Sequence, residues 1–433
     1  MQVMKWSVIA LAVAAGTTQM AVASSQSESK GFVEDSSFNI FNRALYMNRD
    51  YKNGADTTTD PASAKRNGYS EEFGLGIRLL FESGFTEGTV GVGFDAHSLS
   101  SIKLDTGKGR AGIGQFDKNG DGQAEDTQSE IGGAIKFRVS DTVLKHGNQF
   151  VGSPVFTTDD SRILPEVATG TLITSNEFEG LELTAGRFTA ISNQESTDRD
   201  TKGLKSADII GASYSFTDNL SGAIHASDVE DHFKKYYVNL NYNLPLAEEQ
   251  ALNFDFNAYR TTDTGDKLSS DVDNKIWSLA AAYSFGAHTV TLAHQRSTGN
   301  TGYKYGVDGK GTVWLANSVQ YSDFDREDEN SWQARYDIDM ATFGVPGLSF
   351  MTRYITGTNI TVRDSKTGVI TAKNAKEHEF NVEAKYVVQE GAAKDLSFRV
   401  RSAIYRADSD QNGSYGADNN DVRLIVEYPL SVL

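Results

Sequence analysis

The chain of 433 residues has no cysteine, only six prolines and, beyond its first 25 residues, no apolar run as long as a transmembrane helix. The lack of cysteine excludes a disulfide scaffold and a thiolate metal site. Blocks of helix-forming residues at a 3.6-residue period are also scarce. The 40 glycines, 18 tyrosines and 23 phenylalanines are typical of an all-β protein, as are the frequent Asn, Thr and Ser.

The formal charge of −17 argues against a nucleic-acid partner, and the mean hydropathy of −0.42 alone would indicate a soluble protein. The N-terminus nevertheless carries an export signal. Lys5 precedes an apolar run from Val8 to Ala15, and Ala21-Val22-Ala23 forms a small-x-small cleavage site. Residues 1–23 are therefore predicted to be a cleaved signal peptide. Residues 24–433 show no linker or composition break and are predicted to form one β domain.

Many segments of about ten residues alternate between apolar and polar positions, as strands do. In "DLSFRVRSAIYRAD" (395–408), Phe398 and Val400 fall on one face while Arg399 and Arg401 fall on the other. The same pattern appears in "KKYYVNLNYNL" (234–244), "ALNFDFNAYR" (251–260), "SWQARYDIDM" (331–340), "HEFNVEAKYVV" (378–388) and "DVRLIVEYPLSVL" (421–433). Weaker segments begin near residues 38, 71, 88, 129, 169, 181, 207, 219, 275, 287, 312, 347 and 395. The total is about eighteen strands.

Two architectures could hold so many strands: a soluble sandwich or β-helix, and a transmembrane barrel. Charged residues recur on the polar faces, more than a packed interior tolerates, and aromatic residues recur near the ends of the apolar faces. Short turns such as "FTDNL" and "FGAH" also alternate with long segments such as "DYKNGADTTTDPASAKRNGYS" and "YITGTNITVRDSKTGVITAKNAKEHEF". These features favour a transmembrane antiparallel β-barrel with an apolar outer face and a wet lumen.

In a closed barrel the last strand pairs with the first, so basic residues of the last three strands and the first would be neighbours. These residues are Lys385, Arg399, Arg401, Arg423 and Arg49. With strands about 4.8 Å apart, their side chains could form a track that conducts anions. The alternative is an ordinary solvated wall, in which Glu379, Glu383 and Glu427 pair with these bases locally.

Several long motifs, in order, resemble the OprD-like substrate-specific outer-membrane porins of pseudomonads. They include "IKFRVSDTVLKHGNQFVGSPVFTTDDSRILPEVATG", "NEFEGLELTAGRFT", "LANSVQYSDF", "SWQARYDIDMATFGVPGLSFMTRYI", "EAKYVVQEGAAKDLSFRVR" and "DVRLIVEYPLSVL", and the likeness runs from Gly31 to Leu433. The resemblance implies an eighteen-stranded barrel with an inward-folded constriction loop, without a cofactor, metal or catalytic site. It also implies passive, selective uptake of small carboxylate-bearing nutrients, either amino acids or cyclic and aromatic acids.

The resemblance also implies a set of site residues. The family's basic ladder corresponds to the five basic residues named above. The constriction loop would run from Asp141 to Ala168 and place near the narrowest point Asp159, Asp160, Ser161 and Arg162. Asp323 would attract a substrate ammonium, with Ser318 nearby and Tyr305 as a pocket tyrosine. The implied partners are small carboxylates, outer-membrane lipid and lipopolysaccharide, around a monomer or weak trimer.

Other interpretations were weighed. "DKNGDGQAEDT" resembles a calcium loop, but its twelfth position is Gln128 and no flanking helix is predicted. Where the amino-acid branch has a tyrosine-bearing insertion, this chain reads "ESTDRDTKGLKSAD", and the loop after Gln295 is more compact. A barrel enzyme would need a catalytic constellation that the sequence lacks, and a gated transporter would need a plug domain. A general, nonspecific diffusion porin is the main alternative.

Overall fold

The computed structural model describes residues 26–52, 68–105, 110–196, 203–364, 367–408 and 418–433. The predicted signal peptide, residues 1–23, lies outside the described residues. The strands are β1 Ser37–Tyr51, β2 Tyr69–Glu82, β3 Gly91–Asp105, β4 Thr127–Val139, β5 Thr142–Gln149, β6 Gly152–Ser153, β7 Phe156–Thr157, β8 Val167–Phe178, β9 Leu181–Ser192, β10 Ala207–Thr217, β11 Leu220–Val229, β12 Phe233–Ala247, β13 Gln250–Asp263, β14 Asp273–Phe285, β15 His288–Gly299, β16 Asn330–Asp339, β17 Leu348–Arg363, β18 Ile370–Val387, β19 Ser397–Ala407 and β20 Asn419–Ser431. Two short 3-10 helices are η1 Gln26–Glu28 and η2 Met340–Phe343.

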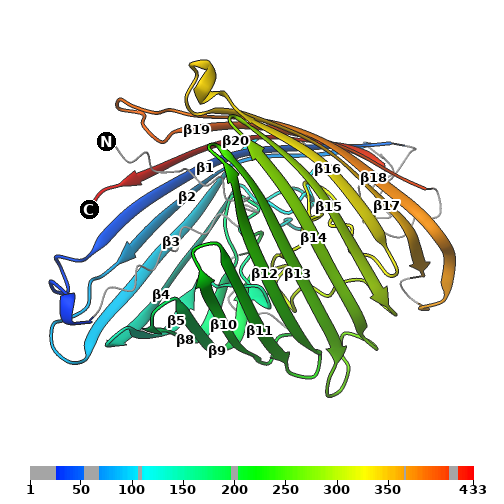
Figure 1. Ribbon diagram of the computed structural model, residues 1–433. Coiled ribbons are helices and arrows are strands. Elements are labelled where there is room, and N and C mark those ends of the chain that lie inside the picture. Colours follow the sequence, from blue (N-terminus) through cyan, green and yellow to red (C-terminus); the bar gives the residue numbers. More distant parts are fainter. Residues whose placement is uncertain (1–25, 53–67, 106–109, 197–202, 365–366, 409–417) are drawn as a thin grey trace.

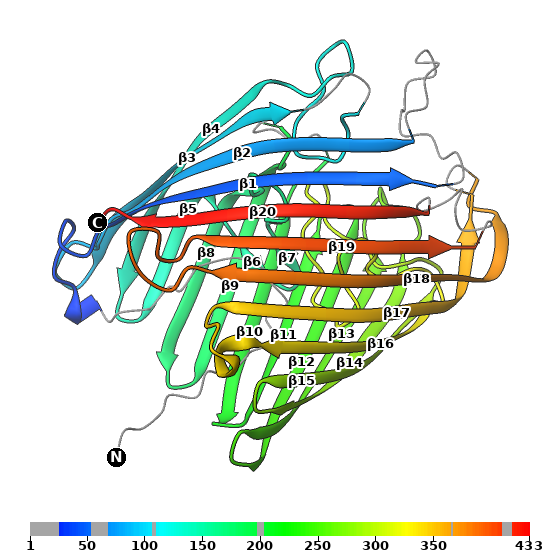
Figure 2. The ribbon, with the colours of Figure 1, turned by 90° about the horizontal axis from the view of Figure 1, so that it is seen from above.

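Eighteen of these strands form one closed antiparallel barrel, and β6 and β7 form a separate hairpin. The barrel closes because β1 pairs with both β2 and β20, so the first and last strands lie side by side (Figures 1 and 2). Tight turns such as residues 218–219 join strands at one end, and longer loops join them at the other. The predicted fold class and strand number are confirmed.

The alternation of each strand separates an apolar outer face from a polar inner face. On β19, Phe398, Val400 and Ile404 are exposed on the outside, whereas Ala403 and Tyr405, of the opposite parity, are fully buried inside. Successive side chains of a strand point to opposite faces, so the guanidiniums of Arg399 and Arg401 face inward. No helix in the described part of the chain is long and apolar enough to cross a membrane.

Three predictions about individual segments were wrong. The segment near residue 312 is a loop, and the missing strand is β5, which shortens the constriction loop from 141–168 to residues 150–166. Val313 and Leu315 alternate because they pack inward under the barrel wall, where Tyr259 Oη accepts the backbone N–H of Trp314 at 3.0 Å. The segment 354–380, predicted as a long loop, is mostly the paired strands β17 and β18.

Two segments that fold into the lumen carry the predicted site residues: the constriction loop (150–166) and a second inner loop (300–329). Both pack on the inner wall around clusters of buried apolar side chains, among them Val155, Phe188 and Leu315. The constriction loop also lies directly against β2. A Cβ on Gly76 would come within 2.3 Å of the Ile163 carbonyl oxygen, so only glycine allows this approach.

Candidate functional site: the narrowed lumen

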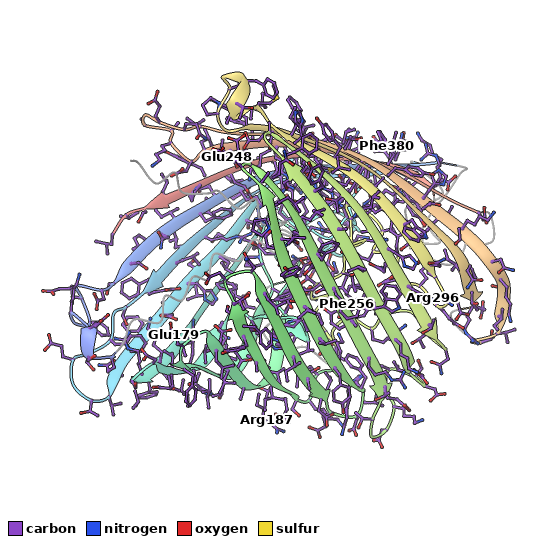
Figure 3. The ribbon with its side chains drawn as sticks, in the orientation of Figure 1. Glu179, Arg187, Glu248, Phe256, Arg296 and Phe380 are labelled. Carbon is purple, nitrogen blue, oxygen red and sulfur yellow. The ribbon has the colours of Figure 1, made fainter. Side chains whose placement is uncertain are left out.

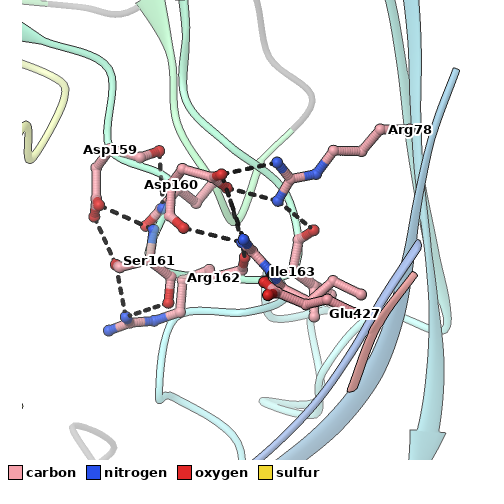
Figure 4. A network of polar contacts seen from close by, with 9 residues as sticks. Arg78, Asp159, Asp160, Ser161, Arg162, Ile163 and Glu427 are labelled. Carbon is pink, nitrogen blue, oxygen red and sulfur yellow. Dashed lines mark hydrogen bonds and ion pairs between the residues drawn. The ribbon is translucent and has the colours of Figure 1, made fainter. Parts of the chain in front are cut away.

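The constriction loop is fixed to the wall by Asp160, which lies between two arginines of adjacent strands (Figure 4). Arg78 on β2 donates to both Asp160 carboxylate oxygens, at 2.6 and 2.9 Å. Arg43 on β1 contacts Asp160 Oδ1 at 2.8 Å and Glu427 Oε1 at 2.7 Å. Burial raises the pKa of Asp160, but the two guanidiniums outweigh it and leave that pKa lowered. The ionised carboxylate therefore fixes this loop.

The next residues of the loop form a tight turn that directs Arg162 toward the basic residues of the wall. Ser161 donates its backbone N–H and its hydroxyl to Asp159, at 3.0 and 2.8 Å. Arg162 Nη1 donates to the Ser161 hydroxyl at 2.9 Å (Figure 4). Burial, followed by the nearby charges of Arg423 and Arg49, lowers the pKa of Arg162 to about 10. Arg162 therefore lies close enough to the basic ladder for the charges of Arg423 and Arg49 to lower its pKa.

The second inner loop carries the predicted acidic group together with one that the sequence reasoning missed. Tyr305 Oη lies within hydrogen-bond reach of Asp323 and, at 2.8 Å, of Asp325, and its one O–H can donate to either carboxylate. The Ser318 hydroxyl donates to Asp323. Burial, and then the charge of Asp323, raises the pKa of Asp325 to about 7. Burial also raises the pKa of Asp323. Two carboxyls sharing one tyrosine therefore form an acidic pocket.

Glu166 joins the two loops. Its carboxylate oxygens accept backbone N–H groups from Lys310 at 2.6 Å, Asp159 at 2.8 Å and Gly311 at 3.2 Å. Burial raises the pKa of Glu166 to about 7 despite these three hydrogen bonds. The constriction loop and the second inner loop therefore act as one frame around the narrowed lumen.

Arg49 and Arg423 share Asp421, a fully buried carboxylate on β20. Their Nε atoms lie 2.8 and 2.7 Å from its two oxygens. The second inner loop joins this group: Gln320 donates to Asp421 Oδ1 at 2.8 Å, and its carbonyl oxygen accepts from Arg423 at 2.6 Å. The acidic pocket begins three residues later along the same segment. One loop thus connects the basic wall to Asp323.

Arg399 and Arg401 on β19 likewise share a single carboxylate, Glu383 of β18, at 2.8 and 3.0 Å. Lys385 lies directly opposite Arg399, and Arg401 lies opposite Arg423. Among the described residues, Lys385 has no ion pair. The five predicted residues therefore occupy four adjacent strands, on one inner face, with two carboxylates between them.

The sequence reasoning missed several residues that its own pattern could have found. Arg43 has the same parity as Arg49, and Arg353 is an inward residue of β17 that donates to Asn381 Oδ1 at 2.7 Å. Asp421 stands two residues before Arg423 on the same face. Arg78 gives no comparable signal, because its role depends on contact with a loop distant in sequence. The described residues hold no group of three or more His, Cys, Asp or Glu able to bind a metal.

A closed barrel with an apolar exterior, a charged inner wall and loops folded into its lumen defines a water-filled channel of the outer membrane. The comparisons agree. The sequence model described as "outer membrane porin, OprD family" matches residues 30–432. Porin D of Pseudomonas aeruginosa is 46% identical over 460 residues, covering 100% of both chains. This chain belongs to the OprD family of outer-membrane porins, whose members are channels.

Solved structures give the same result. The crystal structure of OccAB1 from Acinetobacter baumannii superposes with a TM-score of 0.87 at 34% identity, covering 95% of this chain and 100% of that one. The crystal structure of OpdK from Pseudomonas aeruginosa with vanillate superposes with a TM-score of 0.80 at 31% identity, covering 93% and 100%.

Proposed function

We propose that this porin is a passive channel selective for small carboxylate-bearing nutrients, either amino acids or cyclic and aromatic acids. The observation that carries the proposal is an excess of positive charge on one inner wall. Of the five cations on β18, β19, β20 and β1, four share Glu383 or Asp421, and Lys385 has no ion pair among the described residues. The charges of Arg423 and Arg49 also act on Arg162 of the constriction loop. If the charges of this wall were simply solvated and paired with local carboxylates, no excess of positive charge would remain.

The ladder would guide a carboxylate by successive exchange of hydrogen bonds. Guanidiniums present paired N–H donors that match the two oxygens of a carboxylate. Because Arg399 and Arg401 divide one carboxylate between them, each keeps N–H groups for a passing anion. Adjacent donors allow binding strong enough for entry and weak enough for release.

The acidic pocket would select among carboxylates. Asp325 and Asp323 would attract a substrate ammonium while the ladder holds its carboxylate, which favours zwitterions. Vanillate, in the OpdK structure, is an aromatic carboxylate without an ammonium group. In this chain, amino acids and aromatic acids would both use the ladder and would differ in their use of the acidic pocket.

Uptake into liposomes that contain the purified protein tests the proposal. We expect arginine and benzoate to enter faster than uncharged arabinose, and the double variant Arg399→Ala, Arg401→Ala to lower carboxylate uptake about tenfold, consistent with charge-assisted hydrogen bonds. Lys136→Ala, Lys145→Ala is a matched control, because these inward cations share Asp95 in the same manner. Equal rates for arabinose, arginine and benzoate, unchanged in the ladder variant, would instead establish a nonspecific porin.

A further inference from the structure

Three cations lie on the outer face of β13, β14 and β15, near the end that carries the long loops. Arg260 lies directly opposite Lys275, and Arg296 lies opposite Trp277, one step along the next strand pair. Lys275 and Arg296 are exposed and alternate with buried inward residues such as Ile276 and Ser297. In Figure 3, Glu248 and Arg296 lie toward opposite ends of the outer wall, with Phe256 between them.

These cations are not balanced by the protein itself. Like charges directly opposite each other on a sheet are destabilising. Asp273 pairs with Arg260 and lies on the same face as Lys275, so one carboxylate serves both. Among the residues that the structure describes, Arg296 forms no ion pair. The cluster thus carries an excess of two positive charges.

Two other outward-facing cations near the same end of the barrel are each matched by a carboxylate. Arg187 on β9 lies 3.0 Å from Asp208, and Lys234 on β12 lies 3.1 Å from Asp228. All four side chains lie on the outward-facing parity of their strands. These two pairs are therefore neutral, whereas the cluster on β13 to β15 keeps an excess of positive charge.

An aromatic and aliphatic surface lies directly below the cations, toward the middle of the wall. The rings of Trp277 and His294 are 5.0 Å apart, and those of His294 and Trp332 are stacked at 4.3 Å. Trp332 is 56% exposed and Leu292 is 59% exposed on the same face. From the loop end toward the middle of the wall, this surface carries cations, then aromatic rings, then aliphatic side chains. That order matches an amphiphile with an anionic headgroup, interfacial sugars and acyl chains.

We propose that Arg260, Lys275 and Arg296 bind the phosphates of an outer-leaflet glycolipid of the lipid A type, a phosphorylated disaccharide with several acyl chains. The long loops of an outer-membrane barrel face the outside, which places the three cations at the headgroups of the outer leaflet. The disaccharide lies over Trp277 and Trp332, and the acyl chains follow the aliphatic wall below. This proposal concerns the outer surface and is independent of what passes through the lumen.

The test is a titration of the folded protein in detergent micelles with lipid A that carries both phosphates, read by native mass spectrometry. Lys275→Gln, Arg296→Gln should weaken binding about 30-fold, since each interfacial cation contributes roughly fivefold. Arg187→Gln, Lys234→Gln removes the same residue types from the same outer rim, but from pairs that are already neutral, and should keep wild-type affinity. Unchanged conductance and unchanged heat-dependent gel mobility show that each variant is folded.

Three results would overturn the proposal: equal loss in both double variants, equal affinity of the wild type for lipid A stripped of its phosphates, or displacement of the lipid by an equal concentration of inorganic phosphate. The last result would mean that the cluster binds free phosphate and not a lipid headgroup. Lipid-specific loss confined to Lys275→Gln, Arg296→Gln would support it.

Discussion

The two loops that narrow the lumen each carry an aspartate held away from bulk water, and the pKa values of these carboxyls move in opposite directions. On the constriction loop, Arg43 and Arg78 outweigh burial and lower the pKa of Asp160. On the second inner loop, burial and the charge of Asp323 raise the pKa of Asp325 to about 7. The same side chain is therefore a permanent anion in one loop and a titrating group in the other.

This contrast separates the contacts that fix the two loops from those that can recognise a substrate. Asp160 already accepts hydrogen bonds from two guanidiniums, and its lowered pKa keeps it ionised near neutral pH. Its carboxylate oxygens are therefore occupied and cannot readily bind a ligand. The second inner loop is held by backbone N–H groups, such as those of Trp314 and Ala316, and by an ion pair of Arg326 with Glu377 at 3.1 Å. Among the described residues, the carboxyls of Asp323 and Asp325 accept hydrogen bonds from hydroxyl groups and form no ion pair, so they gain most from a cationic substrate.

The largest expected effect comes from Asp160→Asn. Removing this carboxylate leaves Arg78 without its ionic partner, and breaking a buried ion pair in this way costs about 3–5 kcal/mol. We expect the constriction loop to leave the wall, with a several-fold rise in single-channel conductance and loss of the difference between arabinose and benzoate uptake. Planar-bilayer recordings measure the first quantity and liposome uptake the second.

Asp159→Asn provides the control for this change. Asp159 is the neighbouring residue, and its carboxylate accepts hydrogen bonds from Ser161 within its own turn and contacts neither Arg43 nor Arg78. Conductance should stay near the wild-type value. If both variants raise conductance equally, the loop is held by its turn and not by the ion pairs.

Much of the barrel could be predicted from the sequence because strand alternation is a local property. The parity of Phe398 and Val400 against Arg399 and Arg401 was sufficient to assign their faces, and closure of the sheet brought Arg49 near them. Strand β5 could not be separated from the loop after it, since Thr142–Gln149 belongs to the motif read as the constriction. The segment near residue 312 was wrongly predicted as a strand, because packing of Val313 and Leu315 inside the lumen also produces alternation.

The counter-charges were harder to predict than the cations. Parity places Arg423 on the inner wall but does not show that Asp421 divides its charge with Arg49, because that depends on the register of β20 against β1. The pairing of Asp160 with Arg78 joins residues 82 positions apart. Long-range strand register and loop packing, and not the local sequence pattern, decide which of these charges remain unpaired and available to a substrate.

The second prediction concerns recognition. Asp325→Asn should lower arginine uptake about tenfold, the cost of one charge-assisted hydrogen bond, and leave benzoate uptake unchanged. The matched variant Asp323→Asn should lower arginine uptake as well, because the two carboxyls share Tyr305. Competition uptake of arginine against benzoate gives the ratio directly. A proportional loss of both substrates would mean that the pocket shapes the lumen without recognising an ammonium group.

A pH titration gives a smaller effect with a defined sign. Because the pKa of Asp325 is raised to about 7, the carboxyl takes up a proton as the pH falls through that value and loses its attraction for cations. The ratio of arginine to benzoate uptake should fall a few-fold between about pH 8 and about pH 6, because benzoate stays ionised throughout. Asp325→Asn should abolish this dependence, and a pH response that persists in the variant would assign it to another group.

The smallest effect is expected for Glu166→Gln, at the junction of the two loops. An ionised Glu166 accepts from Lys310, Asp159 and Gly311, whereas an amide has one acceptor and turns its NH2 toward these donors. The loss of about 1–3 kcal/mol should loosen the junction without freeing the Asp160 anchor. Since the pKa of Glu166 is raised to about 7, protonation at lower pH has a similar effect in the wild type. We therefore expect flickering conductance in wild type only below about pH 7, but in Glu166→Gln at all pH values. Quiet recordings from the variant above that pH would show that the two loops hold their positions independently.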